Sequence, residues 1–470
     1  MADRQEYKDK NENPLSTIVR YEEMVENRKQ YFFDVDQFED IIDHYVSKGE
    51  LKEARHVVSF AISQHPFSTE LVLKKAQILA DSRKPHKALK AIAQIENIEP
   101  GNPELFTIKG SIYAQLREHK KAINCYRTAL EKSEDKAEIW MYIAFEYQNL
   151  GNSVKALDFF QKTVIEDPDN ELALYEIAFC YELNDSLEES IGYYTEFLET
   201  YPFSHAAWYN LGISYSKLKK YSEAIDAYEY AIAIDENFAS AYFNKANALA
   251  NLNRYKEAIE LYEETFKYEE PDAITFYYIG ECYENAEQYE DAIIHYTKAT
   301  EADPEMADAW LSIAMVMELD NRAIEGLKYI EKAIDLEPES SDFWHMYGNY
   351  LQKLQYNHEA EHAYHEATCL DSVNKYIWLD YSEFYFNSGS LERAIELMLE
   401  GIGNIPSNAE LEYRITAYYL ANKERNKACT HLINGLELDF DKHSALLSFY
   451  PRAGELQTVT DLIALYREDS

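Results

Sequence analysis

The chain has 470 residues, of which 46% are apolar and only 14 are glycine and 12 proline, a composition typical of a folded helical protein rather than a disordered one. Its 85 acidic residues against 45 basic ones give a formal net charge of −40. This charge argues against nucleic acid or an anionic membrane as a partner, because clustered Lys and Arg provide most of the affinity for either. Two roles for the charge stay open: it keeps a long exposed protein in solution, or it favours a basic partner.

The cysteines and the first residues bear on where the protein works. The five cysteines are odd in number, widely spaced and form no Cys-x-x-Cys pair, which argues against a disulfide framework and a thiolate zinc site and favours a reducing compartment. The segment from Met1 to Lys8 is polar and unlike a secretory signal. No apolar run approaches the ~20 residues that span a bilayer. We therefore expect a cytoplasmic protein that does not bind a membrane.

Residues 1–34 are predicted to form a disordered start and an N-terminal cap. The polar residues 1–12 are expected to be disordered, and residues 15–28 have apolar side chains at spacings that fit a short helix. The apolar residues of this segment are Leu15, Ile18, Val19 and Val25, and Tyr31, Phe32 and Phe33 follow them.

Residues 35–442 are predicted to form twelve repeats of 34 residues without insertion or deletion. With Val35 as position 1, position 20 is alanine in ten repeats, position 8 is nearly always small, and proline recurs at position 32. Position 24 is aromatic or aliphatic throughout. A fixed period of this length indicates a repeat architecture. All five tryptophans lie at position 4 of a repeat: Trp140, Trp208, Trp310, Trp344 and Trp378.

The spacing within a repeat predicts two helices. Positions 4, 7, 8 and 11 share one helical face and positions 20, 24 and 27 share another, which fits two helices of about 14 residues, each ~20 Å long. Small residues at positions 8 and 20 allow the two backbones to approach closely, while large residues at positions 4, 11 and 24 fill the grooves beside them. Proline at position 32 ends the second helix.

The sixth repeat carries the pattern most completely, with Trp208, Leu211, Gly212, Tyr215, Ala224, Tyr228 and Ala231. This pattern resembles the tetratricopeptide repeat (TPR) family, and the resemblance covers residues 35–442. It implies a right-handed superhelix of about twelve helix pairs, in which the first helix of each pair lines a concave groove and the second forms the convex back. Most members of the family are non-enzymatic adaptors that bind a peptide or partner element in that groove. Phe197, at position 27 of the fifth repeat, departs from the pattern and puts the local packing there in doubt.

Residues 443–470 are predicted to form a degenerate repeat and a C-terminal capping helix. Leu446, Leu447 and Phe449 keep part of the pattern, and Pro451 interrupts it. The last segment has the spacing of an amphipathic helix. A cap is expected at each end, because a solenoid otherwise exposes the apolar faces of its terminal repeats.

The resemblance implies that a ligand contacts positions 2, 5, 9, 12 and 13 of the first helices. Repeats four to eight have aromatic or apolar side chains at most of positions 5 and 9, a composition typical of a binding hot spot. The alternative is that these side chains pack on one another across adjacent repeats, and the sequence leaves both open. The predicted groove residues are Met141, Phe145, Tyr175, Phe179, Tyr209, Ile213, Phe243 and Tyr277, with Asn247 and Glu281 among them.

The same positions indicate the kind of partner. Positions 5 and 9 of repeats four to eight contain no Lys or Arg, which argues against the carboxylate clamp found in the chaperone-binding branch of the family. An extended segment or a helix with apolar anchors and basic flanks fits better.

One segment, from His358 to His362, matches the His-Glu-x-x-His pattern of zinc proteases. Its register offers a simpler interpretation, since Ala360 is the alanine of position 20 and Glu359 occupies a position that is often Glu in this chain. A metal-dependent hydrolase is therefore an unfavoured alternative.

The sequence thus predicts an all-α solenoid that acts as a non-enzymatic scaffold for a protein or peptide, without a cofactor. A structural subunit of a larger assembly is a further alternative, and homo-oligomerisation is left open.

Overall fold

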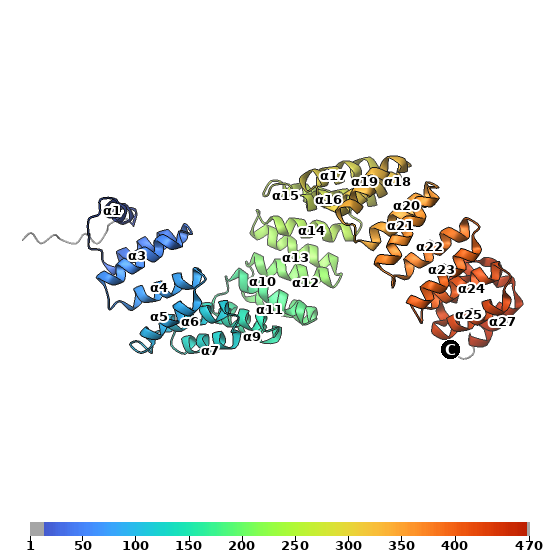
Figure 1. The fold of residues 1–470 in the computed structure, drawn as a ribbon. Coiled ribbons are helices and arrows are strands. Elements are labelled where there is room, and N and C mark those ends of the chain that lie inside the picture. The colour runs from blue at the N-terminus through green and yellow to red at the C-terminus, as the bar shows by residue number, and fades with distance from the viewer. Residues whose placement is uncertain (1–13, 468–470) are drawn as a thin grey trace, which may run out of the picture. The chain divides into compact units, whose positions relative to one another are not determined.

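The computed structural model describes residues 14–467, which form 27 α-helices, two short 3₁₀-helices and no β-strand (Figure 1). The prediction of an all-α solenoid of helix hairpins is confirmed. Within this part of the chain no helix has the length and apolar character needed to cross a membrane. The predicted disorder of residues 1–12 lies outside the described residues.

The chain divides into two compact halves, residues 1–248 and 249–470. In the N-terminal half, α1 (Pro14–Glu26) precedes helices that begin alternately at position 1 and position 17 of each 34-residue repeat. The first helices are α2 (Val35–Ser47), α4 (Thr69–Asp81), α6 (Pro103–Gln115), α8 (Ala137–Asn149), α10 (Glu171–Leu183), α12 (His205–Lys217) and α14 (Ala239–Asn251), and α14 contains the division between the halves. The second helices are α3 (Leu51–Gln64), α5 (Pro85–Glu96), α7 (His119–Leu130), α9 (Ser153–Glu166), α11 (Leu187–Thr200) and α13 (Tyr221–Ile234).

The C-terminal half continues in the same register. Its first helices are α16 (Ala273–Asn285), α18 (Ala307–Leu319), α20 (Ser341–Lys353), α22 (Lys375–Asn387) and α24 (Ala409–Ala421). Its second helices are α15 (Tyr255–Thr265), α17 (Tyr289–Ala302), α19 (Ala323–Leu336), α21 (Asn357–Leu370), α23 (Leu391–Asn404) and α25 (Arg425–Leu438). The chain ends with η1 (Phe440–Lys442), α26 (His443–Phe449), η2 (Pro451–Glu455) and α27 (Gln457–Arg467).

Local chemistry explains why the helices begin and end at the same positions in each repeat. Ser68, Asn170 and Ser204 cap first helices, each accepting a hydrogen bond from a backbone N–H of the first turn. Position 15, in the turn between the two helices, has a positive φ in all twelve repeats. This left-handed residue ends the first helix and reverses the chain. Only three of the twelve are glycine: Gly49, Gly151 and Gly389.

The tryptophans connect one repeat to the next. The indole N–H of Trp208 donates a hydrogen bond to the carbonyl oxygen of Pro202, 2.9 Å away, and Trp310 donates in the same way to Pro304 at 3.0 Å. Position 4 of one repeat is thus bonded to position 32 of the preceding one. Proline ends the second helix and leaves its own carbonyl available to accept this bond.

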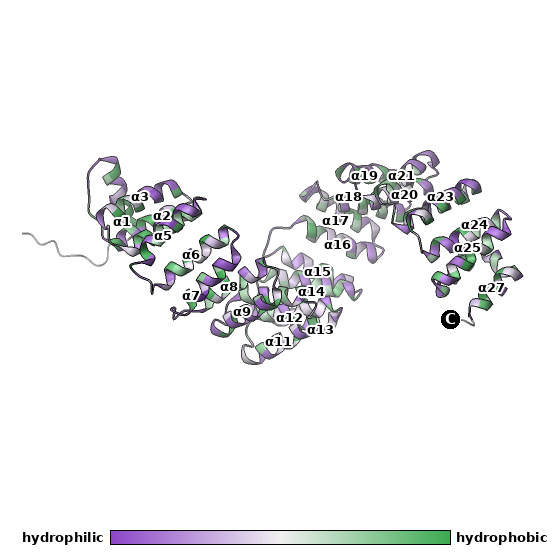
Figure 2. Ribbon diagram, turned by 60° about the horizontal axis from the view of Figure 1, so that its bottom comes forward, coloured by the Kyte–Doolittle hydropathy of each residue, from purple (hydrophilic) through white to green (hydrophobic). Residues whose placement is uncertain are grey.

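The core of each hairpin lies where the two helices cross. The position-20 alanines are almost completely buried, and so are the rings at position 24, among them Tyr194, Tyr228 and Tyr364. Every helix in Figure 2 shows both hydrophobic and hydrophilic residues, which is expected when one face is buried and the other meets water.

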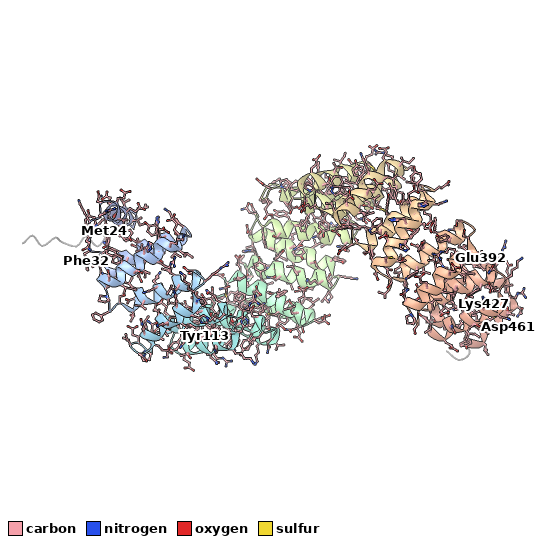
Figure 3. All side chains as sticks on the ribbon, viewed as in Figure 1. Met24, Phe32, Tyr113, Glu392, Lys427 and Asp461 are labelled. Atoms are coloured by element: carbon pink, nitrogen blue, oxygen red, sulfur yellow. The ribbon has the colours of Figure 1, made fainter. Side chains whose placement is uncertain are left out.

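Both ends of the described chain fold onto the neighbouring hairpin. On α1 the buried residues include Ile18 and Met24, whereas Phe32 in the following segment is 61% exposed; Figure 3 labels Met24 and Phe32. At the other end, Phe449 of α26 packs on Phe386, with ring centroids 5.4 Å apart, and on Tyr418 at 5.8 Å. These contacts cover part of the first-helix face of the last repeats.

Candidate partner-binding surface

The predicted groove residues of the N-terminal half lie on one face of α8, α10, α12 and α14. All of them are partly or largely accessible, but to different degrees. Phe179 is 48% exposed, whereas the others are half-buried. The half-buried residues are Met141, Phe145, Tyr175, Tyr209, Ile213, Phe243 and Asn247.

Tyr209 is held mainly by packing. Its ring lies 4.8 Å from that of Phe238 and 6.0 Å from that of Tyr175, and its hydroxyl accepts a hydrogen bond from Nδ2 of Asn244 at 2.7 Å. Burial raises the pKa of Tyr209 above its ordinary value, and it raises the pKa of Tyr175 to about 12. Both phenols therefore stay neutral and can offer a partner only apolar ring surface and a neutral hydroxyl.

Met141 and Phe145 also contribute to the core. Both pack against the buried cluster of the N-terminal half, and the Phe145 ring meets that of Phe160 edge-on at 5.2 Å. Asn247 donates a weak hydrogen bond to Oδ1 of Asn244 at 3.4 Å. Tyr209 and Phe145 thus have packing contacts, whereas Phe179 is exposed.

Helix α10 exposes two further apolar side chains that the sequence prediction missed. Leu172 is 48% exposed and Leu183 is 56% exposed. They occupy positions 2 and 13 of the fifth repeat, which the resemblance names as ligand-facing, so attention to all five positions would have found them. We call Leu172, Phe179 and Leu183 the α10 stripe.

The charged groups around the α10 stripe are mostly acidic. Helices α8, α10 and α12 together carry five glutamates and one lysine, and no arginine or aspartate. Glu176, one turn before Phe179, accepts a hydrogen bond from Nε2 of Gln148 at 2.5 Å. The lysine, Lys217, forms an ion pair with Glu182.

The hairpin that carries the stripe is more open than its neighbours. The backbones of α10 and α11 approach each other less closely than those of α8 and α9 or of α12 and α13. Phe197 fills position 27 here, and its ring lies near those of Tyr193 and Tyr201, at 6.3 and 4.8 Å. A large ring thus occupies position 27 in this hairpin, the departure from the pattern that Phe197 showed in the sequence.

In the C-terminal half, Tyr277 and Glu281 lie on the corresponding face of α16. The Tyr277 ring packs on that of Tyr296 at 5.3 Å, and its hydroxyl is 3.4 Å from Oγ of Ser312. Glu281 is exposed. Tyr277 and Glu281 belong to the C-terminal half, which is a separate body from the half that contains the groove residues of α8 to α14.

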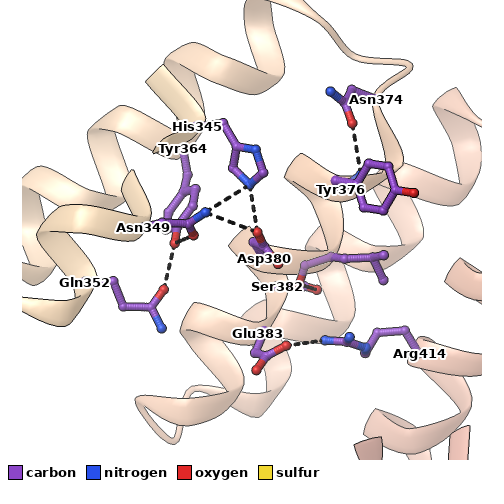
Figure 4. Close-up of polar contacts among 11 residues, drawn as sticks. His345, Asn349, Gln352, Tyr364, Asn374, Tyr376, Asp380, Ser382, Glu383 and Arg414 are labelled. Atoms are coloured by element: carbon purple, nitrogen blue, oxygen red, sulfur yellow. Dashed lines mark hydrogen bonds and ion pairs between the residues drawn. The ribbon is translucent and has the colours of Figure 1, made fainter. Parts of the chain in front are cut away.

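A polar cluster that the sequence did not predict joins α20, α22 and α24 (Figure 4). Oδ2 of Asp380 lies 2.8 Å from Nε2 of His345 and accepts a bond from Asn349 at 3.3 Å. On the next pair of helices, Arg414 donates to Glu383 at 2.7 Å. Burial alone would raise the pKa of Asp380, but the hydrogen bonds from His345 and Asn349 and the charge of Arg414 outweigh it and lower that pKa. The cluster links three consecutive repeats through paired side chains.

Parts of the chain are similar to known repeat families and to a solved structure. Models described as tetratricopeptide repeat match residues 103–135, 172–204, 205–238, 243–307 and 283–341. The chain is a tetratricopeptide repeat protein. No curated protein matches this TPR protein. One solved structure that it resembles is described as the crystal structure of YrrB, a TPR protein with an unusual peptide-binding site; the identity is 23%, the match covers 38% of this chain and 92% of that chain, and the TM-score is 0.33.

The His-Glu-x-x-His segment of this TPR protein lies on the second helix α21. Ala360 is fully buried, whereas His362 and His365 are exposed. Each of these two histidines has Oε1 of Glu366 as a neighbour at 3.8 Å. Among residues 14–467, no three His, Cys, Asp or Glu side chains are grouped so that they could hold a metal ion. The TPR repeats support a protein-interaction scaffold.

Proposed function

We propose that this TPR protein is a non-catalytic scaffold that holds a segment of a partner protein against the first-helix face of α8, α10, α12 and α14. The observation that carries this proposal is the α10 stripe, whose three large apolar side chains are each about half exposed on one helix. Large apolar side chains exposed together on one face of a helix favour a contact site. The half-buried rings of Phe145, Tyr175 and Tyr209 would form the rigid floor beside it.

We also propose that the protein works in the cytoplasm. All five cysteines are unpaired, which fits a reducing compartment. Tyr277 and Glu281 are proposed to contribute a separate contact within the C-terminal half.

A site-specific photo-crosslinker tests the binding surface in the cell. It replaces Phe179 in the full chain, and in a matched chain it replaces Ile165, which is 76% exposed on the second helix α9. We expect discrete adducts with a partner protein from position 179 and none from position 165. Equal adducts from both positions, or none from position 179, would contradict the proposed surface.

A further inference from the structure

The α10 stripe runs straight along its helix. Phe179 follows Leu172 by seven residues and Leu183 follows Phe179 by four. At 3.6 residues per turn the three side chains fall within an arc of about 40°, and at 1.5 Å per residue they extend over ~16 Å. An apolar ridge of this length matches about three turns of a second helix.

The apolar surface does not continue across the neighbouring helices at its two ends. At position 2, Leu172 is flanked by the exposed Glu138 on α8 and by the buried Ala206 on α12. At position 13, Leu183 is flanked by the exposed Asn149 and Lys217. An extended peptide that crossed the helices at either end of the stripe would meet Glu138, Asn149 or Lys217, whereas an element parallel to α10 can contact Leu172, Phe179 and Leu183 together.

The charged groups beside the α10 stripe determine which polar residues a partner can carry next to its apolar face. Glu176 lies between Leu172 and Phe179 and about 40° from the former around the helix, so its carboxylate borders the ridge. Glu171 and Glu182 lie at the two ends of α10, where Glu171 is 3.4 Å from Nε2 of His205 and Glu182 is paired with Lys217. A partner with Lys or Arg beside its apolar face complements these carboxylates, and one with Asp or Glu there is repelled.

We propose that the partner segment is an amphipathic α-helix that lies along α10. Its apolar side chains recur at i, i+4, i+7 and i+11 and pack against Leu172, Phe179 and Leu183, and Lys or Arg residues beside them face Glu176. This inference rests on the proposed function and adds the conformation and chemistry of what is bound. The α10–α11 hairpin is more open than the α8–α9 and α12–α13 hairpins on either side of it.

Peptide display tests the helical conformation of the partner separately from the proposed binding surface. A library of random 16-residue peptides is selected on the purified full chain and counter-selected on the chain with Phe179→Ser and Leu183→Ser. We expect the enriched peptides to share apolar residues at helical spacing with basic residues beside them. Enriched peptides with apolar residues at every second position would overturn the helix while leaving the binding surface intact. Recovery of no peptide that depends on Phe179 and Leu183 would overturn both.

Affinity measurements on an enriched peptide complete the test. Fluorescence anisotropy compares the peptide with a scrambled peptide of the same composition, which controls for attraction of any cation to a chain of net charge −40. We expect Phe179→Ser to weaken binding about tenfold or more, Glu176→Gln to weaken it about threefold, and Ile165→Ser to leave it unchanged. A central proline in the peptide should abolish binding, because it breaks the helix. Equal affinity of the original and proline-containing peptides would overturn the proposal.

Discussion

Gly212 of α12 lies against the ring of Tyr228 on α13, so that a Cβ on residue 212 would be 2.5 Å from Cε1 of the ring. The ring is held in place: Tyr228 is 1% exposed, packs on Tyr209 at 5.8 Å, and its hydroxyl is 3.2 Å from Oγ of Ser216. We expect Gly212→Ala to lower the free energy of unfolding by at least about 1 kcal/mol, because overpacking outweighs the gain in helix propensity. The urea midpoint of the full chain measures the effect.

Gly192, inside α11, is the matched control for this substitution. A Cβ there would have no atom within 4 Å. Gly192→Ala should therefore show the propensity effect alone and raise the free energy of unfolding by up to about 1 kcal/mol. If both variants shifted the urea midpoint upward, the ring of Tyr228 would not exclude a Cβ at residue 212, and the prediction would be wrong.

In the turn between the two helices of a repeat, we expect a gain of glycine to stabilise the protein and a loss of glycine to destabilise it. Glu287 is an exposed residue at position 15 with a φ of 59°, a conformation that is unfavourable for a side chain with a Cβ. We expect Glu287→Gly to stabilise the protein by about 0.5–1 kcal/mol, and Gly151→Ala, at a φ of 69°, to destabilise it by about 1–2 kcal/mol. Thermal unfolding of the two variants would show opposite shifts, and shifts of the same sign would contradict this explanation.

The sequence predicted the hairpins because their contacts restrict residue size at fixed intervals. Alanine at position 20 in ten of the repeats and a small residue at position 8 in most of them mark where two backbones meet, so the period is visible in the sequence. The left-handed residue at position 15 leaves no such signature. Arg, Lys, Asp, Asn, Glu and Gln all occur there, and its conformation is set by the helix end rather than by the residue type.

The candidate surface was only partly predictable for a related reason. An aromatic residue on a first helix can contact a partner or pack on the next repeat. The sequence does not distinguish these two roles for Phe179 and Tyr209. Exposure depends on the spacing of neighbouring helices, and the α10–α11 hairpin is more open than the hairpins on either side of it. The division near residue 248 also leaves no mark, since the repeat continues through it without insertion. The assignment of residues 35–442 as one array between two caps stays a prediction.

We expect His295 on α17 to make the stability of the C-terminal half depend on pH. Burial lowers the pKa of His295, and the charge of Lys298 lowers it further, against a rise from the hydrogen bond to the carbonyl of Asp291. The folded state therefore favours the neutral ring, which stacks on Tyr283 at 5.1 Å. The unfolded chain binds the proton more readily, so this contribution is fully present above about pH 6.5 and is lost as the pH falls toward the lowered pKa.

The variant His295→Gln removes this titration. Between pH 8 and pH 5.5 we expect the urea midpoint of the variant to fall less than that of the wild type. Titration of the ring by NMR should place the pKa of His295 below 6.5. A wild-type and a variant protein with the same loss of midpoint over this range would contradict the assignment.

The C-terminal cap is predicted to stabilise the last repeats through Phe449. Its ring packs on Phe386 and Tyr418, and the guanidinium of Arg414 lies 3.7 Å from the ring centroid. Because Phe449 is half-buried, Phe449→Ala should cost about 2 kcal/mol, less than truncation of a fully buried ring. Hydrogen exchange should then increase in α24 to α27 and stay unchanged in α16 to α19. Leu465→Ala, at a residue 58% exposed on α27, is the control and should alter neither region. Faster exchange throughout the C-terminal half would show instead that it unfolds as one cooperative body, in which the cap has no local role.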